Sequence, residues 1–193
     1  MIERKEVIKI FKKNNALLNG HFRLSSGFHS DTYFQSALIL QYPKKAYKLI
    51  KNIVKQIKQH NIKINCVIAP AIGGIIVGYE IGRILNVRSM FTERVNGKVC
   101  LKRNFLINKK ERILISEDVI TTGLSIKEVM TVIKSYDAKV VAIAALVDRS
   151  TKKINFGVPK FSLLNLKIKN YEEKKCPMCK KGSIAIQPGS RNQ

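Results

Sequence analysis

The sequence predicts a single α/β domain in which a central, mostly parallel sheet is flanked by helices. Its 193 residues suit one such domain and are enough to bury a substantial core. Short apolar runs with the character of buried strands alternate with segments of helical periodicity. These runs fall at 64–70, 87–93, 113–115 and 139–147, and a last strand is expected within 160–168. The run at 139–147, KVVAIAALV, is almost uninterrupted, which is typical of an interior parallel strand.

The N-terminal region predicts a helix followed by a β-rich segment. Apolar residues between positions 2 and 18 recur at helical spacing and indicate an amphipathic helix. Residues 20–40 are rich in Ser, Gly and aromatic residues and alternate in places as a β-hairpin does. Pro43 then opens a lysine-rich helix that is expected to end near His60, and its lysines form a solvated face.

The stretch at 112–128, RILISEDVITTGLSIKE, holds the strongest functional signal. A short apolar strand ends in two adjacent carboxylates, Glu117 and Asp118, and a helical pattern begins near Ser125. In open α/β sheets, ligands bind where strand carboxyl ends meet helix amino ends, and free N–H groups there attract phosphate. Two carboxylates would repel that phosphate unless they bind something else, such as ribose hydroxyls or a metal. The combination indicates a phosphorylated sugar with Mg²⁺, whereas an ordinary βα turn would not need the acidic pair.

This stretch resembles the phosphoribosyl-pyrophosphate (PRPP) signature of type I phosphoribosyltransferases. The block GHFRLSSGFHSDTYF, which begins at Gly20, resembles the hood of the orotate phosphoribosyltransferases. The resemblance covers nearly the whole chain, with several motifs in the right order. It implies one type I phosphoribosyltransferase domain over 1–193, with the first helix and a small hood over about 1–40, a core over about 41–170 and a tail over about 171–193.

The resemblance also implies an activity. The ribose 5-phosphate group of PRPP would be transferred to orotate, giving orotidine 5′-monophosphate and pyrophosphate, a step of de novo pyrimidine (UMP) biosynthesis. Mg²⁺ would be bound mainly through PRPP, and no protein metal ligands are expected. The alternatives are a phosphoribosyltransferase for another base and a non-catalytic PRPP-sensing regulator that binds nucleic acid.

Site residues follow from the same resemblance, position by position. Glu117 and Asp118 would hold the ribose hydroxyls, and the loop after them would cradle the 5′-phosphate. The complete set expected to bind PRPP is Glu117, Asp118, Val119, Ile120, Thr121, Thr122, Gly123, Leu124 and Ser125. In the preceding strand-to-helix junction, PAIGG, Gly73 and Gly74 would let main-chain groups approach the pyrophosphate.

Orotate is expected to contact Thr121, Arg149 and Phe34. Arg149 follows the apolar strand and could form a bidentate pair with the orotate carboxylate. The alternative for this arginine is a structural ion pair with Asp148 or Glu117. In the hood, Ser25, Ser26, Gly27, Tyr33 and Phe34 would lie near the base. Some members of the family have a lysine where this chain has Ser25.

The segment ERVNGKVCLKRNF, from Glu93, resembles the mobile catalytic loop of the orotate enzymes. In that reading Arg94 and Lys98 are catalytic and reach the pyrophosphate in the site of a second subunit, which implies a homodimer with shared sites. A second lysine and a histidine of some members correspond to Val95 and Cys100 here. The alternative is a plain basic hairpin on a basic protein.

The four cysteines do not make a disulfide framework in a chain of this length. Cys176 and Cys179 form a C-x-x-C pair, which supplies two metal ligands where structural zinc needs four. His21, His29 and His60 are far away in sequence, so no complete metal site is expected within one chain. The tail is expected to pack on the hood or across a dimer.

The net charge of +23 is the one compositional anomaly. It arises from 27 lysines and 9 arginines spread from end to end, so a drift of composition towards Lys, Ile and Asn explains it better than a nucleic-acid surface. The charged N-terminus lacks the apolar run of a signal peptide, and no stretch reaches the roughly 20 apolar residues that span a bilayer. A cytoplasmic protein without nucleic-acid or membrane partners is expected.

Overall fold

A computed structural model describes residues 2–24 and 26–188. Its six-stranded central sheet has the order β5-β4-β3-β6-β7-β8, with all neighbours parallel except β4 and β5. The strands are β3 (Cys66–Pro70), β4 (Arg88–Val95), β5 (Lys98–Leu101), β6 (Arg112–Ile120), β7 (Lys139–Asp148) and β8 (Lys160–Asn165). The predicted α/β class with a mostly parallel sheet is confirmed.

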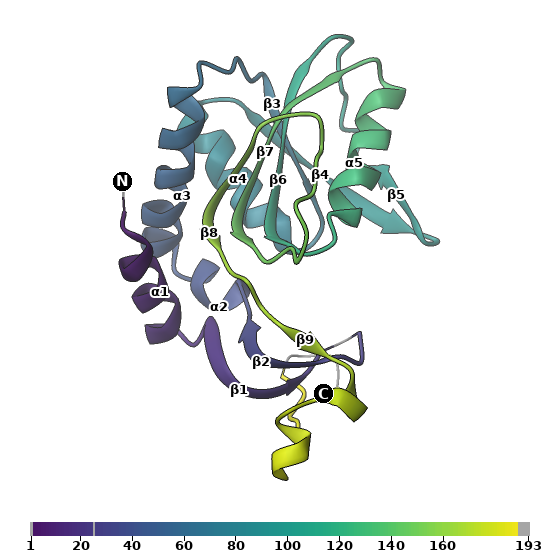
Figure 1. Ribbon diagram of the computed structural model, residues 1–193. Coiled ribbons are helices and arrows are strands. Elements are labelled where there is room, and N and C mark those ends of the chain that lie inside the picture. The colour runs from purple at the N-terminus through teal and green to yellow at the C-terminus, as the bar shows by residue number, and fades with distance from the viewer. Residues whose placement is uncertain (1, 25, 189–193) are drawn as a thin grey trace.

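Helices cover both faces of this sheet and make three layers (Figure 1). The helices are α1 (Arg4–Lys13), α2 (Ala37–Leu40), α3 (Pro43–Gln59), α4 (Gly73–Leu85) and α5 (Leu124–Ser135). The alternation of side chains along each strand divides the core in two. On β6, Leu114 packs in the cluster that includes α3 and α4, whereas Ile113 and Ile115 pack in the cluster that includes α5.

Helix α4 lies unusually close to the sheet because glycines recur at every fourth position along it. A Cβ at Gly78 would lie 2.6 Å from the hydroxyl oxygen of Ser116 on β6, and a Cβ at Gly82 would lie 3.0 Å from the Cβ of Ser89 on β4. The missing side chains therefore allow the helix backbone to rest on the strands. This contact fixes the start of α4 beside the carboxyl end of β6.

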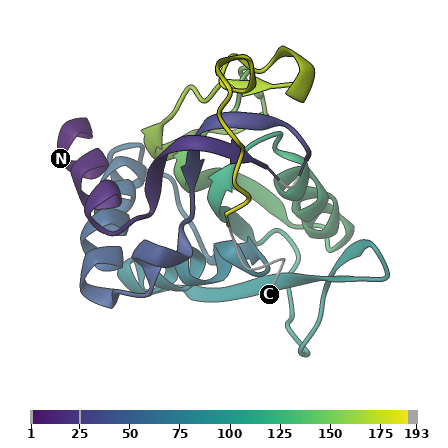
Figure 2. The same cartoon turned by 90° about the horizontal axis from the view of Figure 1, so that it is seen from below.

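A second, three-stranded sheet contains β1 (Leu17–Arg23), β2 (His29–Phe34) and β9 (Asn170–Tyr171), in that order. We call this sheet the hood. Figure 1 shows it below the core, and strand β8 runs down to β9. Because β3, β6 and β7 are parallel to β8, their carboxyl ends face the hood. Figure 2, seen from the hood side, shows β1 and β2 crossing in front of the core.

The C-terminal tail packs on the hood, which is one of the two arrangements expected from the sequence. It contains two short 3₁₀ helices, η1 (Glu173–Lys175) and η2 (Cys179–Lys181). Ile186 forms a bridge with Phe22 of β1. The tail also brings Cys176 and Cys179 against His21 and His29. The expectation that these histidines lie too far away is wrong, because folding of the tail removes the separation in sequence.

Two element boundaries differ from the predicted ones. The first helix ends at Lys13, because Asn15 adopts a left-handed conformation with φ of 54° and Leu17 and Leu18 then pair with β2. Strand β6 does not stop before its carboxylates. It continues to Ile120, because β7 pairs alongside it as far as Asp148.

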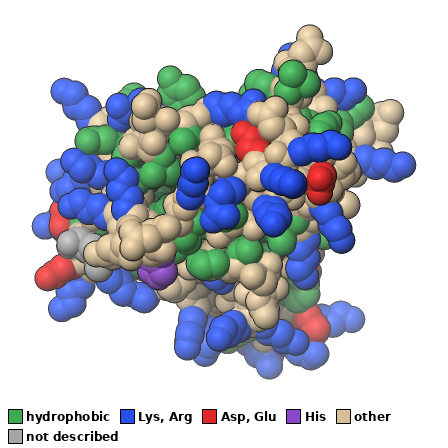
Figure 3. All heavy atoms as spheres, turned by 90° about the horizontal axis from the view of Figure 1, so that it is seen from above, with side chains coloured by type: hydrophobic (Ala, Val, Ile, Leu, Met, Phe, Trp, Pro, Cys, Tyr) green, Lys and Arg blue, Asp and Glu red, His purple; other side chains and the backbone are tan. Residues whose placement is uncertain are grey.

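On the face opposite the hood, basic side chains are scattered rather than collected in one patch (Figure 3). Figure 3 shows lysines and arginines scattered across the face opposite the hood, with few acidic side chains among them. This distribution agrees with a general drift of composition. None of the described helices combines the length and the apolar character needed to cross a membrane.

Candidate active site

The acidic pair, Glu117 and Asp118, lies near the carboxyl end of β6, beside the start of α4. The two side chains differ in environment, because Glu117 is only 7% exposed and Asp118 is half-buried. Asp118 accepts a hydrogen bond from the hydroxyl of Ser36 and another from the backbone N–H of Val119, at 2.8 Å. The carboxylate of Asp118 is thus held in one orientation by groups from two parts of the chain.

Glu117 is expected to carry a proton at neutral pH. Burial, reinforced by the neighbouring Asp118 carboxylate, raises the pKa of Glu117 to about 9. Its Oε1 accepts the backbone N–H of Asp118 at 3.1 Å. The pair therefore carries about one negative charge rather than two, which lowers the repulsion that it would exert on a nearby phosphate.

The glycines of the PAIGG segment lie directly against this pair. A Cβ on Gly73 would lie 2.6 to 2.7 Å from the carboxylate atoms of Asp118, and a Cβ on Gly74 would lie 3.2 Å from Oε1 of Glu117. Two strand-to-helix junctions, one after β3 and one after β6, thus meet at one point. A ligand bound there would touch both.

Gly73→Ala should lower kcat/KM at least about tenfold, because the new methyl group must displace the Asp118 carboxylate. The helix itself should tolerate alanine, which is favoured over glycine by about 1 kcal/mol in helices. Steady-state kinetics measure the first effect, and thermal unfolding measures the second. Unchanged kinetics in a folded variant would mean that the position of Asp118 does not matter.

The predicted phosphate loop forms a small pocket between β6 and α5. Its lining comes from within residues 117–126 and does not include the predicted Asp118 and Thr122. The lining residues are Glu117, Val119, Ile120, Thr121, Gly123, Leu124, Ser125 and Ile126. Gly123 has φ of +75°, and a Cβ there would also lie 2.8 Å from the ring of Phe156. Only glycine meets both demands, and α5 begins directly after it, with N–H groups in its first turn that have no partner within the helix. Such a loop can bind a phosphate.

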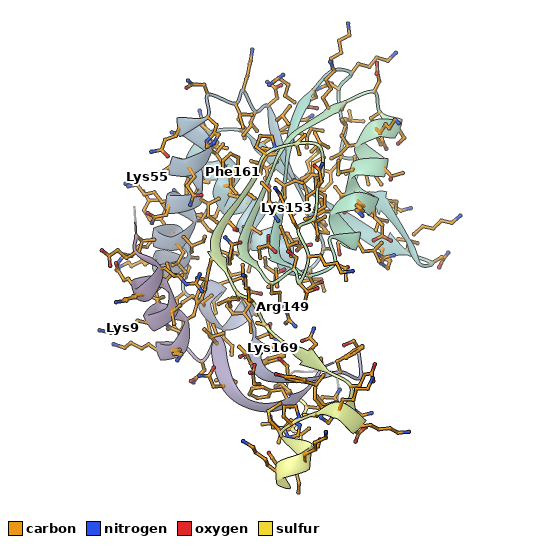
Figure 4. All side chains as sticks on the ribbon, viewed as in Figure 1. Lys9, Lys55, Arg149, Lys153, Phe161 and Lys169 are labelled. Atoms are coloured by element: carbon orange, nitrogen blue, oxygen red, sulfur yellow. The ribbon has the colours of Figure 1, made fainter. Side chains whose placement is uncertain are left out.

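Arg149 extends from the end of β7 into the region between the core and the hood (Figure 4). Asp148 pairs with Lys160 and also accepts the backbone N–H of Ser150 at 2.9 Å, so it is not the partner of Arg149. Burial lowers the pKa of Arg149, and the neighbouring Tyr33 side chain opposes this lowering in part. Among the described residues no carboxylate pairs with Arg149. The structural ion pair considered from the sequence is therefore not formed.

Phe34 does not have the environment predicted for a base contact. Its ring is 6% exposed and packs edge-on against Phe11 of α1, with ring centroids 5.0 Å apart. Because adjacent side chains of a strand point to opposite faces, Tyr33 faces the other way, near Arg149. The prediction for Phe34 is wrong, and Tyr33 is the aromatic residue of β2 on the site side. Ser25, another predicted neighbour of the base, lies outside the described residues.

The segment that contains Arg94 and Lys98 is a β-hairpin rather than an irregular loop. Asn96 and Gly97 form its turn with φ of 50° and 79°, as expected for a tight hairpin. It projects sideways from the sheet beyond α5 (Figure 1). Arg94 donates to Glu128 of α5 and to the carbonyl of Gly97. Of the described carboxylates, none pairs with Lys98.

Sequence reasoning missed Ser36, which holds Asp118 from 82 positions away. Nothing in the local pattern around Ser36 indicates this role. It also missed Lys160, whose pairing with Asp148 leaves Arg149 without a neighbouring carboxylate. Both contacts depend on how distant segments meet, and neither residue belongs to a motif.

The comparisons with known proteins agree with this geometry. Residues 39–172 match the family described as "Phosphoribosyl transferase domain". The chain is 47% identical over 190 residues to the orotate phosphoribosyltransferase of Desulforamulus reducens, covering 98% of each chain. It is 46% identical to that of Caldanaerobacter subterraneus subsp. tengcongensis, covering 98% of this chain and 99% of the relative. The crystal structure of orotate phosphoribosyltransferase from Aeropyrum pernix has a TM-score of 0.69 at 24% identity, covering 83% of this chain and 94% of that one, and it shares the fold.

Proposed function

The chain belongs to the orotate phosphoribosyltransferase family, and we propose that the β6–α5 pocket binds PRPP while Arg149 and Tyr33 bind orotate above it. The enzyme transfers the ribose 5-phosphate group of PRPP to orotate and forms orotidine 5′-monophosphate and pyrophosphate. The observation that carries the residue assignment is the meeting of three features at one edge of the sheet. These are the acidic pair, the phosphate loop and Arg149.

PRPP would lie along the carboxyl end of β6. Asp118, held by Ser36, accepts hydrogen bonds from the ribose hydroxyls, and neutral Glu117 can both accept and donate. The backbone N–H groups from Thr121 to Ser125 surround the 5′-phosphate. The pyrophosphate then extends towards the backbone at Gly73 and Gly74, whose missing side chains leave room for the acidic pair.

The reaction requires no nucleophilic side chain of the protein. A ring nitrogen of orotate attacks the anomeric carbon of the ribose while the bond to pyrophosphate breaks, through a transition state with oxocarbenium character. The proton of that nitrogen is released and is taken up by solvent or by the departing pyrophosphate. The chain contributes by positioning the two substrates and by stabilising charge on the departing group. Both effects need a rigid binding surface, which the hydrogen-bonded Asp118 and the close-packed α4 supply.

Mg²⁺ fits the chemistry of this site. The ion prefers oxygen ligands and is commonly held by substrate phosphates with one or two carboxylates, and here Asp118 is the carboxylate beside the expected PRPP, with neutral Glu117 next to it. When bound, Mg²⁺ neutralises charge on the leaving pyrophosphate. The residues on which its position depends are those that fix Asp118, namely Ser36 and Val119.

Selection of orotate over other bases depends on Arg149 and the hood. Arg149 is half-buried and has no described carboxylate partner, so a ligand carboxylate would relieve the cost of burying its charge. Orotate carries such a carboxylate, whereas hypoxanthine, adenine and uracil do not. PRPP consumption in the presence of Mg²⁺ should depend on orotate. Equal consumption with one of the three other bases would overturn the assignment.

A homodimer is supported by two surface features. Ile72, Ile76 and Tyr79 form an exposed apolar stripe at the start of α4, with 86%, 48% and 64% of their surface exposed. The β4–β5 hairpin projects from the sheet (Figure 1), and Lys98 begins β5 directly after its turn, from where it reaches the site of a second copy. The dimer then shares its active sites. Light scattering should give twice the mass of one chain.

Glu117 should make stability depend on pH. Its pKa is about 9 when folded and near 4.5 when unfolded, so between these values the folded chain retains a proton that the unfolded chain loses. The free energy of unfolding therefore falls as pH rises through this window. Glu117→Gln removes the effect, so its stability relative to the original chain should increase from about pH 5 to about pH 9. Parallel pH profiles from denaturant unfolding would contradict the raised pKa.

A further inference from the structure

The hood and the tail bring four metal-ligating side chains together outside the active site. They are His21 of β1, His29 at the start of β2, and Cys176 and Cys179 of the tail. One ligand atom from each lies within 4.8 Å of all the others. None of the four residues belongs to the acidic pair, the phosphate loop or the surroundings of Arg149 described above.

The separations between these atoms match a tetrahedral site. Zn–S distances near 2.3 Å and Zn–N distances near 2.0–2.1 Å place sulfur and nitrogen ligands roughly 3.6 Å apart at a tetrahedral angle. The thiol sulfur of Cys176 lies 3.5 Å from Nε2 of His21, and that of Cys179 lies 3.6 Å from the same atom. Cys179 sulfur is also 3.3 Å from Nδ1 of His29. Three sulfur–nitrogen pairs thus lie near the expected spacing, and the two ligand nitrogens, Nε2 of His21 and Nδ1 of His29, are 2.9 Å apart.

The surroundings of the cluster also suit a structural metal. His21, His29 and Cys176 are 7%, 2% and 0% exposed, so the site is almost closed to water. The other ring nitrogen of His21, Nδ1, lies 3.2 Å from the hydroxyl of Ser183. A hydrogen bond to the second nitrogen is the usual means of orienting a ligating histidine. The two cysteines are free thiols in the described structure.

The cluster connects segments that have little else to hold them. The pairing of β2 with β9 extends over only two residues on each strand, and the tail after Tyr171 contributes two short 3₁₀ helices and the single bridge between Ile186 and Phe22. A two-stranded hairpin is marginally stable in water. A metal ion coordinated by four ligands from β1, β2 and the tail would hold these three segments together and have no open coordination position.

We propose that His21, His29, Cys176 and Cys179 bind one structural zinc ion, which anchors the C-terminal tail to the hood. Two thiolates and two imidazoles in tetrahedral array favour zinc over magnesium or calcium, which prefer oxygen ligands. The ion is separate from the Mg²⁺ that accompanies PRPP. Its role is to hold the hood strands together, not to take part in the transfer reaction.

The test begins with the metal content of the full chain, purified without chelators. Elemental analysis should find about one zinc per chain, and Co²⁺ exchanged into the site should show thiolate charge-transfer bands and tetrahedral d–d bands. Removal of zinc should lower the melting temperature, and zinc should restore it. These measurements need no activity and no variant, so they do not depend on the assignment of the active site.

Variants then identify the ligands. Cys179→Ser should lose the zinc, and Cys179 is the choice because it is the least buried of the four. Cys100→Ser, at another half-buried free cysteine outside the cluster, should keep it. The proposal is overturned if the original chain binds no zinc after reconstitution, if it holds iron instead, or if Cys179→Ser retains zinc with unchanged affinity. A Cys176–Cys179 disulfide in zinc-replete protein would also overturn it.

Discussion

Lys98→Ala should lower kcat by about 10²–10³-fold while the protein stays folded, because it removes a positive charge that stabilises the departing pyrophosphate. Lys98 is the stronger candidate of the two predicted catalytic residues. Arg94 is paired with Glu128 in the same chain, whereas Lys98 stands at the start of β5 with no described carboxylate partner. The measurement is steady-state kinetics at saturating orotate and PRPP.

Lys55→Ala is the matched control, since Lys55 is an exposed lysine of α3 on the far side of the core (Figure 4). It makes the same change in net charge and should leave kcat unaltered. If both variants lose activity equally, the effect comes from the general positive field of the protein. If neither does, Lys98 has no part in catalysis.

The same residue tests the sharing of sites between subunits. Lys98→Ala chains mixed with Asp118→Ala chains should recover about a quarter of the original activity, because half of the random dimers are hybrids and each hybrid has one intact site. Each variant alone should be nearly inactive. No recovery in dimers proved to be mixed would place Lys98 in the site of its own chain.

Arg149→Ala should raise the KM for orotate by about 10- to 150-fold, which corresponds to loss of a charged hydrogen bond worth about 1.5–3 kcal/mol. The KM for PRPP should change little, because Arg149 lies at the end of β7 and the phosphate loop lies at the end of β6. Initial rates with each substrate varied in turn separate the two constants.

Arg149→Lys provides the control for charge alone. Lysine keeps the positive charge but cannot form the bidentate contact, so its KM for orotate should fall between those of the original chain and the alanine variant. Equal increases in both KM values for Arg149→Ala would contradict contact with the orotate carboxylate. They would indicate a general loosening of the sheet edge.

The part of the site formed by residues 112–128 could be predicted from the sequence because its elements are contiguous. A strand, an acidic pair, a glycine turn and a helix start occupy residues 112–128, and local order alone brings them together. Arg149 was predictable for a similar reason, since it directly follows a buried strand whose neighbour is β6. Parallel strands then place both features at one edge.

Contacts between distant segments were the ones that sequence reasoning missed. Alternation in β2 shows that Tyr33 and Phe34 face opposite ways, but only the packing of Phe11 decides which of them enters the core. The cluster of His21, His29 and two cysteines has the same origin. His21 and His29 lie eight positions apart in the predicted hairpin. Considered together with the C-x-x-C pair, they could have predicted a four-ligand metal site.

The most direct test of the account is a crystal structure with Mg²⁺, orotate and a non-reactive PRPP analogue. We expect ribose hydroxyls on Asp118 and Glu117, the 5′-phosphate in the loop from Thr121 to Ser125, and the orotate carboxylate on Arg149. Phe34 should remain against Phe11. A phosphate bound elsewhere than at the β6–α5 turn, or an orotate carboxylate held by another cation, would contradict the account.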